Sequence, residues 1–130
     1  KATGYAGQVY GISVDEPADE LKPLVARLAS ETAVSLGLSH TFTPADIIAN
    51  DDYLGGGYAV MGDPEKEAIL LFARFEGVLL DPVYTGRAAA GMMDLIRRGE
   101  FGKDEAVLFW HTGGMPALFE TGYAARLATS

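Results

Sequence analysis

The stretch LLDPVYTGRA, residues 79–88, joins a short apolar segment directly to the start of a helix. Residues 78–80 predict a very short strand, which the Asp81-Pro82 pair ends. The hydroxyl of Thr85 can accept a backbone N–H, so we expect it to cap a helix over residues 85–98. A strand that leads through a short loop into a helix is the repeating unit of α/β folds.

The remainder of the chain repeats this alternation of short apolar runs and helical periodicity. The other predicted elements are strands at residues 9–14 and 106–111, a short connection and strand within residues 42–50, and helices at residues 21–36 and 63–75. Gly37 stands where a helix ends in a left-handed residue, and Asp63-Pro64 reads as a cap followed by the first helical position. We therefore predict an α/β fold with a mostly parallel open sheet and flanking helices.

The composition limits the classes of partner. Ten Lys and Arg against 18 Asp and Glu give a net charge of −8, which disfavours nucleic acid and anionic membranes as partners. The absence of cysteine excludes disulfides, thiolate metal sites and Cys nucleophiles. No apolar run approaches the ~20 residues of a membrane span, and 130 residues suit one unit. We expect a single cytoplasmic α/β segment over residues 1–130.

The loops after two predicted strands carry the candidate site. In an open parallel sheet, ligands bind beyond the carboxyl ends of the strands. The loop at residues 81–86 follows one strand, and Thr112, Gly113 and Gly114 follow another. Glycines let the backbone approach a ligand closely, and the Thr112 hydroxyl can bond to it. Ordinary turn chemistry is the alternative explanation.

Other chemistries lack their residues. His40 and His111 are too few for a zinc site, so we predict no metal. Neither a Gly-Lys-Ser/Thr phosphate loop nor a dinucleotide fingerprint occurs. The glycine triplet at residues 55–57 favours a flexible turn, Asp51 and Asp52 favour a solvated turn, and Tyr58 fits either core or pocket.

Three stretches resemble one family closely. Residues 79–88, 95–99 (LIRRG) and 108–119 (LFWHTGGMPALF) resemble the D-cysteine desulfhydrase and 1-aminocyclopropane-1-carboxylate deaminase family of pyridoxal-phosphate enzymes. The resemblance implies the type II, tryptophan synthase β-like fold and pyridoxal 5′-phosphate as cofactor. It runs from Val9 to Phe119 but matches only the C-terminal part of the family's length, which implies that the chain is part of a longer enzyme.

The resemblance leaves the family's cofactor-binding lysine and phosphate loop unmatched. A lysine that binds the cofactor covalently needs a protected pocket that lowers its pKa. The lysines here, Lys1, Lys22, Lys66 and Lys103, all lie in polar contexts. We therefore expect this segment alone to be inactive and to need the N-terminal remainder of the same enzyme as a partner. The resemblance also implies that the enzyme is a homodimer.

The resemblance also implies roles for individual residues. Tyr84 matches an active-site tyrosine near the amino and carboxylate groups of the substrate. Thr85 stands where the deaminases have a glutamate that faces the pyridine nitrogen, and Thr112 stands where they have leucine and the desulfhydrases have threonine. Gly113 and Gly114 would let the backbone pass close to the ring. A threonine hydroxyl offers the ring only a neutral hydrogen bond, which suffices more readily for expelling sulfur than for opening a cyclopropane.

The implied function is that of a lyase of cysteine metabolism. It would eliminate a β-sulfur group from a small amino acid and give pyruvate and ammonia, with D-cysteine as the first choice of substrate. The alternatives are an L-cysteate sulfo-lyase, a 1-aminocyclopropane-1-carboxylate deaminase and a non-catalytic α/β binding domain.

Overall fold

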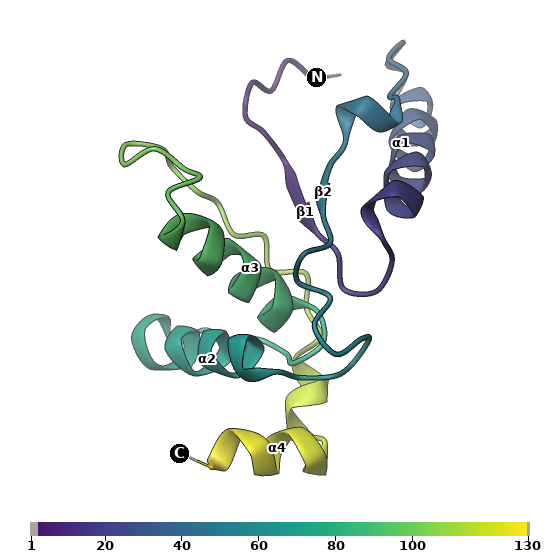
Figure 1. The fold of residues 1–130 in the computed structure, drawn as a ribbon. Helices are drawn as coiled ribbons and strands as arrows, with labels where there is room; N and C mark the ends of the chain where they lie inside the picture. The colour runs from purple at the N-terminus through teal and green to yellow at the C-terminus, as the bar shows by residue number, and fades with distance from the viewer. Residues whose placement is uncertain (1–2, 130) are drawn as a thin grey trace.

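The computed structural model describes residues 3–129 and has helices around a small parallel sheet (Figure 1). Strand β1 (Tyr10–Ile12) pairs in parallel with β2 (Ile48–Asn50), and helix α1 (Ala18–Ser35) connects them. In Figure 1, α1 lies beside β2, and α3 (Thr85–Arg97) lies on the side of β1. This architecture confirms the predicted α/β class.

Helix α1 begins three residues before the predicted start. The backbone N–H of Ala18 donates to the Asp51 carboxylate at 2.8 Å, which satisfies one of the free donors at the helix N-terminus. Asp51 is thus more than the solvated turn residue that we expected. The end of the helix is as predicted, because Gly37 adopts a φ of +71° and the N–H of Leu38 bonds to the carbonyl of Ala33.

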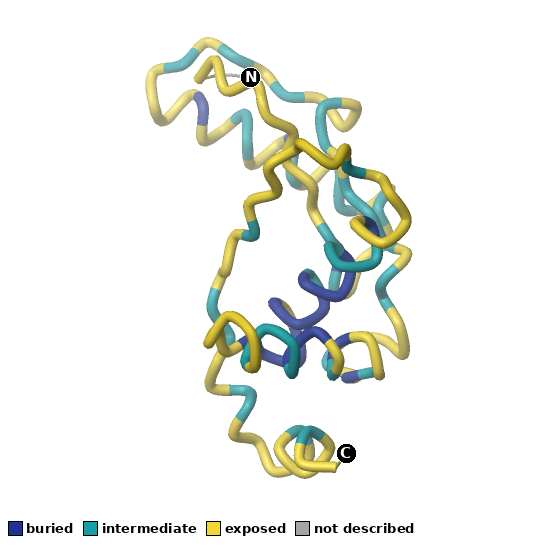
Figure 2. The backbone as a smooth tube through the Cα atoms, turned by 90° about the vertical axis from the view of Figure 1, so that its left-hand side faces the viewer, coloured by how far each residue is buried: buried dark blue, intermediate teal, exposed yellow. Residues whose placement is uncertain are grey.

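Helices α2 (Asp63–Leu71) and α3 pack against each other and enclose the core. Figure 2 shows buried residues gathered there, whereas most of α1 is exposed. The core consists of Met61, Ala68, Ile69, Leu80, Ala89 and Ala90. The N-cap of α2 is Gly62 rather than the predicted Asp63, which is the first helical residue. The side chain of Glu65, in the first turn, accepts the backbone N–H of Gly62.

Helix α2 continues as a π-helical turn, η2 (Phe72–Glu76). A π turn adds a residue to the helical repeat, so the buried stripe shifts around the helix axis. Phe75, the last residue of the helix predicted over residues 63–75, is consequently 74% exposed. The remaining elements are the short 3₁₀ turns η1 (Pro44–Asp46) and η3 (Met115–Phe119) and the helix α4 (Thr121–Ala128).

Two predicted strands, at residues 78–80 and 106–111, are not strands. Both are apolar and irregular, and neither has a ladder partner among the described residues. They meet where the Leu79 carbonyl lies 3.0 Å from the His111 ring Nε2. An apolar run becomes a strand only when a neighbour satisfies its backbone groups. Trp110 in the second run is 77% exposed.

None of the helices described over residues 3–129 is both long enough and apolar enough to cross a membrane.

The position of the core predicts that two adjacent leucines contribute very differently to the free energy of unfolding. Leu80 is fully buried in the core, whereas Leu79 is 47% exposed. Leu80→Ala should lower the free energy of unfolding by ~2–5 kcal/mol, because it leaves a cavity. Leu79→Ala should cost about 1 kcal/mol or less. Urea unfolding of both variants measures the difference, and equal losses would contradict this description of the core.

Candidate functional site

A buried aspartate builds the turn that begins α3. Asp81 is completely buried, and its carboxylate accepts the N–H groups of Val83, Tyr84 and Thr85 at 2.7–2.8 Å. The Thr85 hydroxyl donates to the same carboxylate at 2.7 Å. A carboxylate at a helix N-terminus is also stabilised by the helix dipole. Asp81 is therefore the capping side chain, and the prediction that Thr85 is the cap was wrong.

The two predicted site loops meet at this aspartate. A Cβ added to Gly114 would stand 2.5 Å from the carboxyl carbon of Asp81, so only glycine allows this approach. Gly113 and Gly114 both have positive φ angles, +108° and +90°. The position of a Cβ on Gly113 faces open space. Gly114 thus serves the contact between the loops, and Gly113 leaves room beside them.

Tyr84 projects outward from the buried turn and meets a second tyrosine. Residues 80–83 and 85–87 are buried, but Tyr84 is 43% exposed. Its hydroxyl hydrogen-bonds to that of Tyr58, and the two rings lie 6.1 Å apart in an edge-on arrangement. The sequence left Tyr58 undecided between core and pocket. Its position directly after a glycine triplet, in a loop, was the signal that it could reach the site.

The contact with Tyr84 changes the titration of Tyr58. The hydrogen bond to Tyr84 is the main cause that raises the pKa of Tyr58 above the usual value for a phenol. Partial desolvation and the nearby groups Tyr84, Asp15 and Asp81 raise this pKa further. Tyr58 is therefore a neutral phenol at physiological pH, able to donate a hydrogen bond but disfavoured as a base.

The two threonines of the predicted site differ in what their hydroxyls can offer. Thr85 is buried, and its hydroxyl accepts the Asp81 N–H while donating to the Asp81 carboxylate. Its single proton is thus committed to the turn. Thr112 is exposed, and its hydroxyl has no hydrogen-bond partner within residues 3–129. Of the two, Thr112 has the hydroxyl that is free to bond to a ligand.

These groups fit one part of a pyridoxal-phosphate site. A free hydroxyl at Thr112, open space at Gly113 and two phenols suit a flat heteroaromatic ring with a hydrogen-bonding nitrogen and a polar substrate. They do not include an amine for covalent attachment. Lys66 donates to the backbone carbonyl of Thr129, and Lys103 is exposed.

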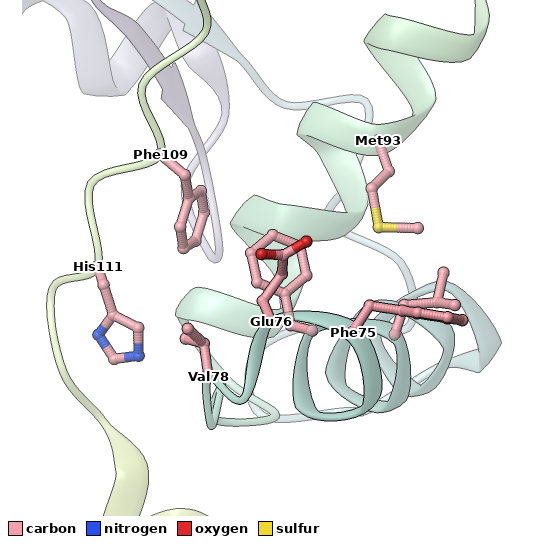
Figure 3. Close-up of a pocket in the computed structure, with 8 residues that line it drawn as sticks. Phe75, Glu76, Val78, Met93, Phe109 and His111 are labelled. Atoms are coloured by element: carbon pink, nitrogen blue, oxygen red, sulfur yellow. The ribbon is translucent and has the colours of Figure 1, made fainter.

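A separate apolar pocket of about 570 Å³ is lined by residues of α2, η2 and α3 and of the two irregular segments at residues 78–80 and 106–111 (Figure 3). In Figure 3, Phe109 and His111 approach it from one side and Met93 from α3. Its lining is Leu71, Phe72, Phe75, Glu76, Val78, Met93, Phe109 and His111. With Glu76 and His111 as its polar members, it offers few groups to orient a cofactor.

Comparison with known proteins identifies the family and the fold of this chain. Residues 2–113 match the family of pyridoxal-phosphate dependent enzymes, and the chain belongs to this family. That result confirms the resemblance and, at the level of the family, the expected cofactor.

The relatives give a narrower similarity. The chain is 46% identical to the D-cysteine desulfhydrase of Yersinia enterocolitica and 47% identical to that of Salmonella typhi. Each match covers 86% of this chain and 33% of the relative, so the chain spans about a third of these relatives' length. A crystal structure of a 1-aminocyclopropane-1-carboxylate deaminase homologue matches 91% of this chain and 34% of its own, with a TM-score of 0.73 and 34% identity. This likeness confirms the predicted fold.

The tyrosine pair predicts a change in titration. Tyr84→Phe removes the hydroxyl that bonds to Tyr58, so the pKa of Tyr58 should fall toward the ~10 of an unperturbed phenol. NMR titration of ¹³C-labelled tyrosine rings measures this pKa directly. Tyr53→Phe is the matched control, because Tyr53 bonds to Asp94 instead and its loss should leave Tyr58 unchanged. A Tyr58 pKa that stays raised without Tyr84 would contradict the pairing.

Proposed function

We propose that the protein that contains this chain is a pyridoxal-phosphate-dependent carbon–sulfur lyase acting on D-cysteine. The reaction consumes one water and releases hydrogen sulfide, pyruvate and ammonia. The observation that carries the proposal is the pair of hydrogen-bonded phenols, Tyr58 and Tyr84. Thr112 belongs to the loop whose Gly114 packs against Asp81, at the start of the same helix as Tyr84. The D-cysteine desulfhydrase relatives support the choice of substrate. The resemblance adds a homodimer in the cytoplasm and covalent attachment of the cofactor through a lysine not matched here.

The cofactor and Thr112 have complementary roles. The bound pyridoxal ring supplies an electron sink for negative charge at the substrate's α-carbon. Thr112 offers a neutral hydrogen bond to the ring nitrogen, and Gly113 leaves the space beside it open. With a neutral group at its nitrogen, the ring would be a weaker electron sink than with a carboxylate there. Elimination of a good sulfur leaving group does not need the stronger sink.

The tyrosine pair acts on the substrate as a proton donor. With its pKa raised, Tyr58 keeps its proton at neutral pH, so the pair can hold the substrate carboxylate or protonate the departing sulfur. Removal of the α-proton would require a phenolate, which the same hydrogen bond disfavours. We therefore assign acid and positioning roles to Tyr84 and Tyr58 and leave the basic role to another group.

The substrate is tested by measuring product release from four compounds. The full protein that the gene encodes should release pyruvate and hydrogen sulfide from D-cysteine faster than it releases products from L-cysteine, L-cysteate or 1-aminocyclopropane-1-carboxylate. Pyruvate and sulfite from L-cysteate at a higher kcat/KM would replace the proposal by a sulfo-lyase. A protein without activity on any of the four, although it binds the cofactor, would favour a binding domain.

Substitution of Thr112 should lower activity without changing stability, whereas substitution of Thr85 should lower stability. Thr112→Val removes an exposed free hydroxyl, so kcat/KM on D-cysteine should fall about 2–12-fold, the equivalent of one hydrogen bond, with Tm unchanged. Thr85→Val leaves the buried Asp81 N–H without its partner and should lower stability by ~1–3 kcal/mol. Kinetics and thermal unfolding of both variants test this. If Thr112→Val is fully active, Thr112 does not contact the ring.

A further inference from the structure

A buried arginine on α3 holds the loop that carries Tyr58. Arg87 is 1% exposed and is the largest fully buried side chain among the described residues. Its Nε donates to Glu65 at 2.7 Å. Its two terminal nitrogens donate to the backbone carbonyls of Val14, Gly57 and Val60 at 2.8–3.0 Å. Burying a guanidinium is costly unless such partners surround it, so this arrangement is closely specified.

Two of these carbonyls flank Tyr58 and its strained neighbour. Gly57 precedes Tyr58, and Val60 follows Ala59, which has a φ of +60°. A residue with a Cβ is disfavoured in this left-handed conformation by roughly 1–2 kcal/mol. Such strain persists only where the surroundings fix the backbone. Here Arg87 fixes both sides, and the Tyr123 hydroxyl donates to the carbonyl of Ala59 between them.

Glu65 orients the arginine and joins the same loop. It is buried, and while Oε1 accepts from Arg87, Oε2 accepts the Gly62 N–H at 2.9 Å. The loop also passes close by at Gly55, where an added Cβ would stand 3.6 Å from the Arg87 guanidinium. The loop from Gly55 to Gly62 therefore wraps around one buried ion pair.

We propose that Arg87, oriented by Glu65, is a positioning residue that places the Tyr58 hydroxyl against the Tyr84 hydroxyl. Tyr84 and Arg87 are three residues apart at the start of α3, so one helical turn carries one phenol and holds the loop of the other. The step from this geometry to turnover rests on the proposed function. The contact between the hydroxyls does not.

A second ion pair between α2 and α3, formed by Arg97 and Glu67, serves as a control for an ion pair that only joins the two helices. Arg97 and Glu67 join the same two helices through two hydrogen bonds of 2.7 and 3.0 Å. Both side chains are about half exposed, and these bonds join them to each other rather than to the backbone of the Tyr58 loop. If helix-to-helix attachment were all that mattered, changing Arg97 would have the same kind of effect as changing Arg87.

The test compares Arg87→Lys with Arg97→Lys in the full protein that the gene encodes. A lysine keeps the charge beside Glu65, but its compact ammonium cannot reach all four acceptors of the guanidinium. In Arg87→Lys the Tyr58 pKa, followed by NMR of labelled tyrosine, should fall toward that of an unperturbed phenol. The kcat on D-cysteine should fall on the order of 10²-fold, the usual effect of a misplaced group, with a smaller change in KM. Arg97→Lys should change neither.

A second variant decides the matter if Arg87→Lys does not fold. Glu65→Gln keeps an acceptor for Arg87 but removes the charge, so both effects should appear at smaller size. A folded variant whose Tyr58 pKa is unchanged overturns the proposal, whatever its kcat. A lowered pKa with an unchanged kcat supports the placement of the Tyr58 hydroxyl but overturns its part in turnover. If the unaltered protein does not act on D-cysteine, the proposed function fails, and the Tyr58 pKa then decides the positioning role by itself.

Discussion

The carboxylate of Asp81 is the charge on which the geometry of the site depends. A fully buried carboxylate is strongly unfavourable unless its oxygens are bonded, and here three backbone N–H groups and one hydroxyl surround it. These bonds fix the backbone from Val83 to Thr85 and begin α3 at a defined residue. Because the turn is fixed in this way, Val83 and Thr85 point inward while Tyr84, between them, points out.

A second buried charge, on Arg87, fixes the backbone of other loops by hydrogen bonds, as Asp81 fixes the backbone of its own turn. The Gly114 loop packs on Asp81, whereas the Tyr58 loop and Val14, two residues after β1, bind to Arg87. Both charges belong to the same helical start, so groups from distant parts of the sequence converge at one point. The parallel sheet brings the segments near one another, but these two side chains determine which backbone atoms meet.

The sequence predicted what depends on local chemistry. Gly37 ends α1 as expected, because a left-handed residue after a helix is a local preference, and the helix predicted from residue 85 begins there. The cap was assigned to Thr85 because its hydroxyl stands directly at the start of the helical pattern, whereas Asp81 lies four residues earlier and was assigned to the end of a strand. Only the buried position of Asp81 decides between them.

Features that depend on distant partners could not be predicted in this way. Arg87 binds residues that lie 22 to 73 positions away in the chain, and no local pattern shows them. Strands have the same property, since residues 106–111 have the apolar composition of a strand but no ladder partner in the described part of the chain. Tyr58 was undecided for the same reason, because its role comes from Tyr84, 26 residues away.

The bond between Thr85 and Asp81 also bears on how the family's two chemistries could be exchanged. The resemblance implies that a deaminase has glutamate at the position of Thr85. Here the side chain of residue 85 touches the fully buried carboxylate of Asp81, so a glutamate would place a second negative charge beside the first. It would also remove the hydroxyl that accepts the Asp81 N–H. Neighbouring substitutions of this kind are not additive, so the effect of a glutamate at residue 85 depends on the groups around the Asp81 carboxylate and cannot be read from that replacement alone.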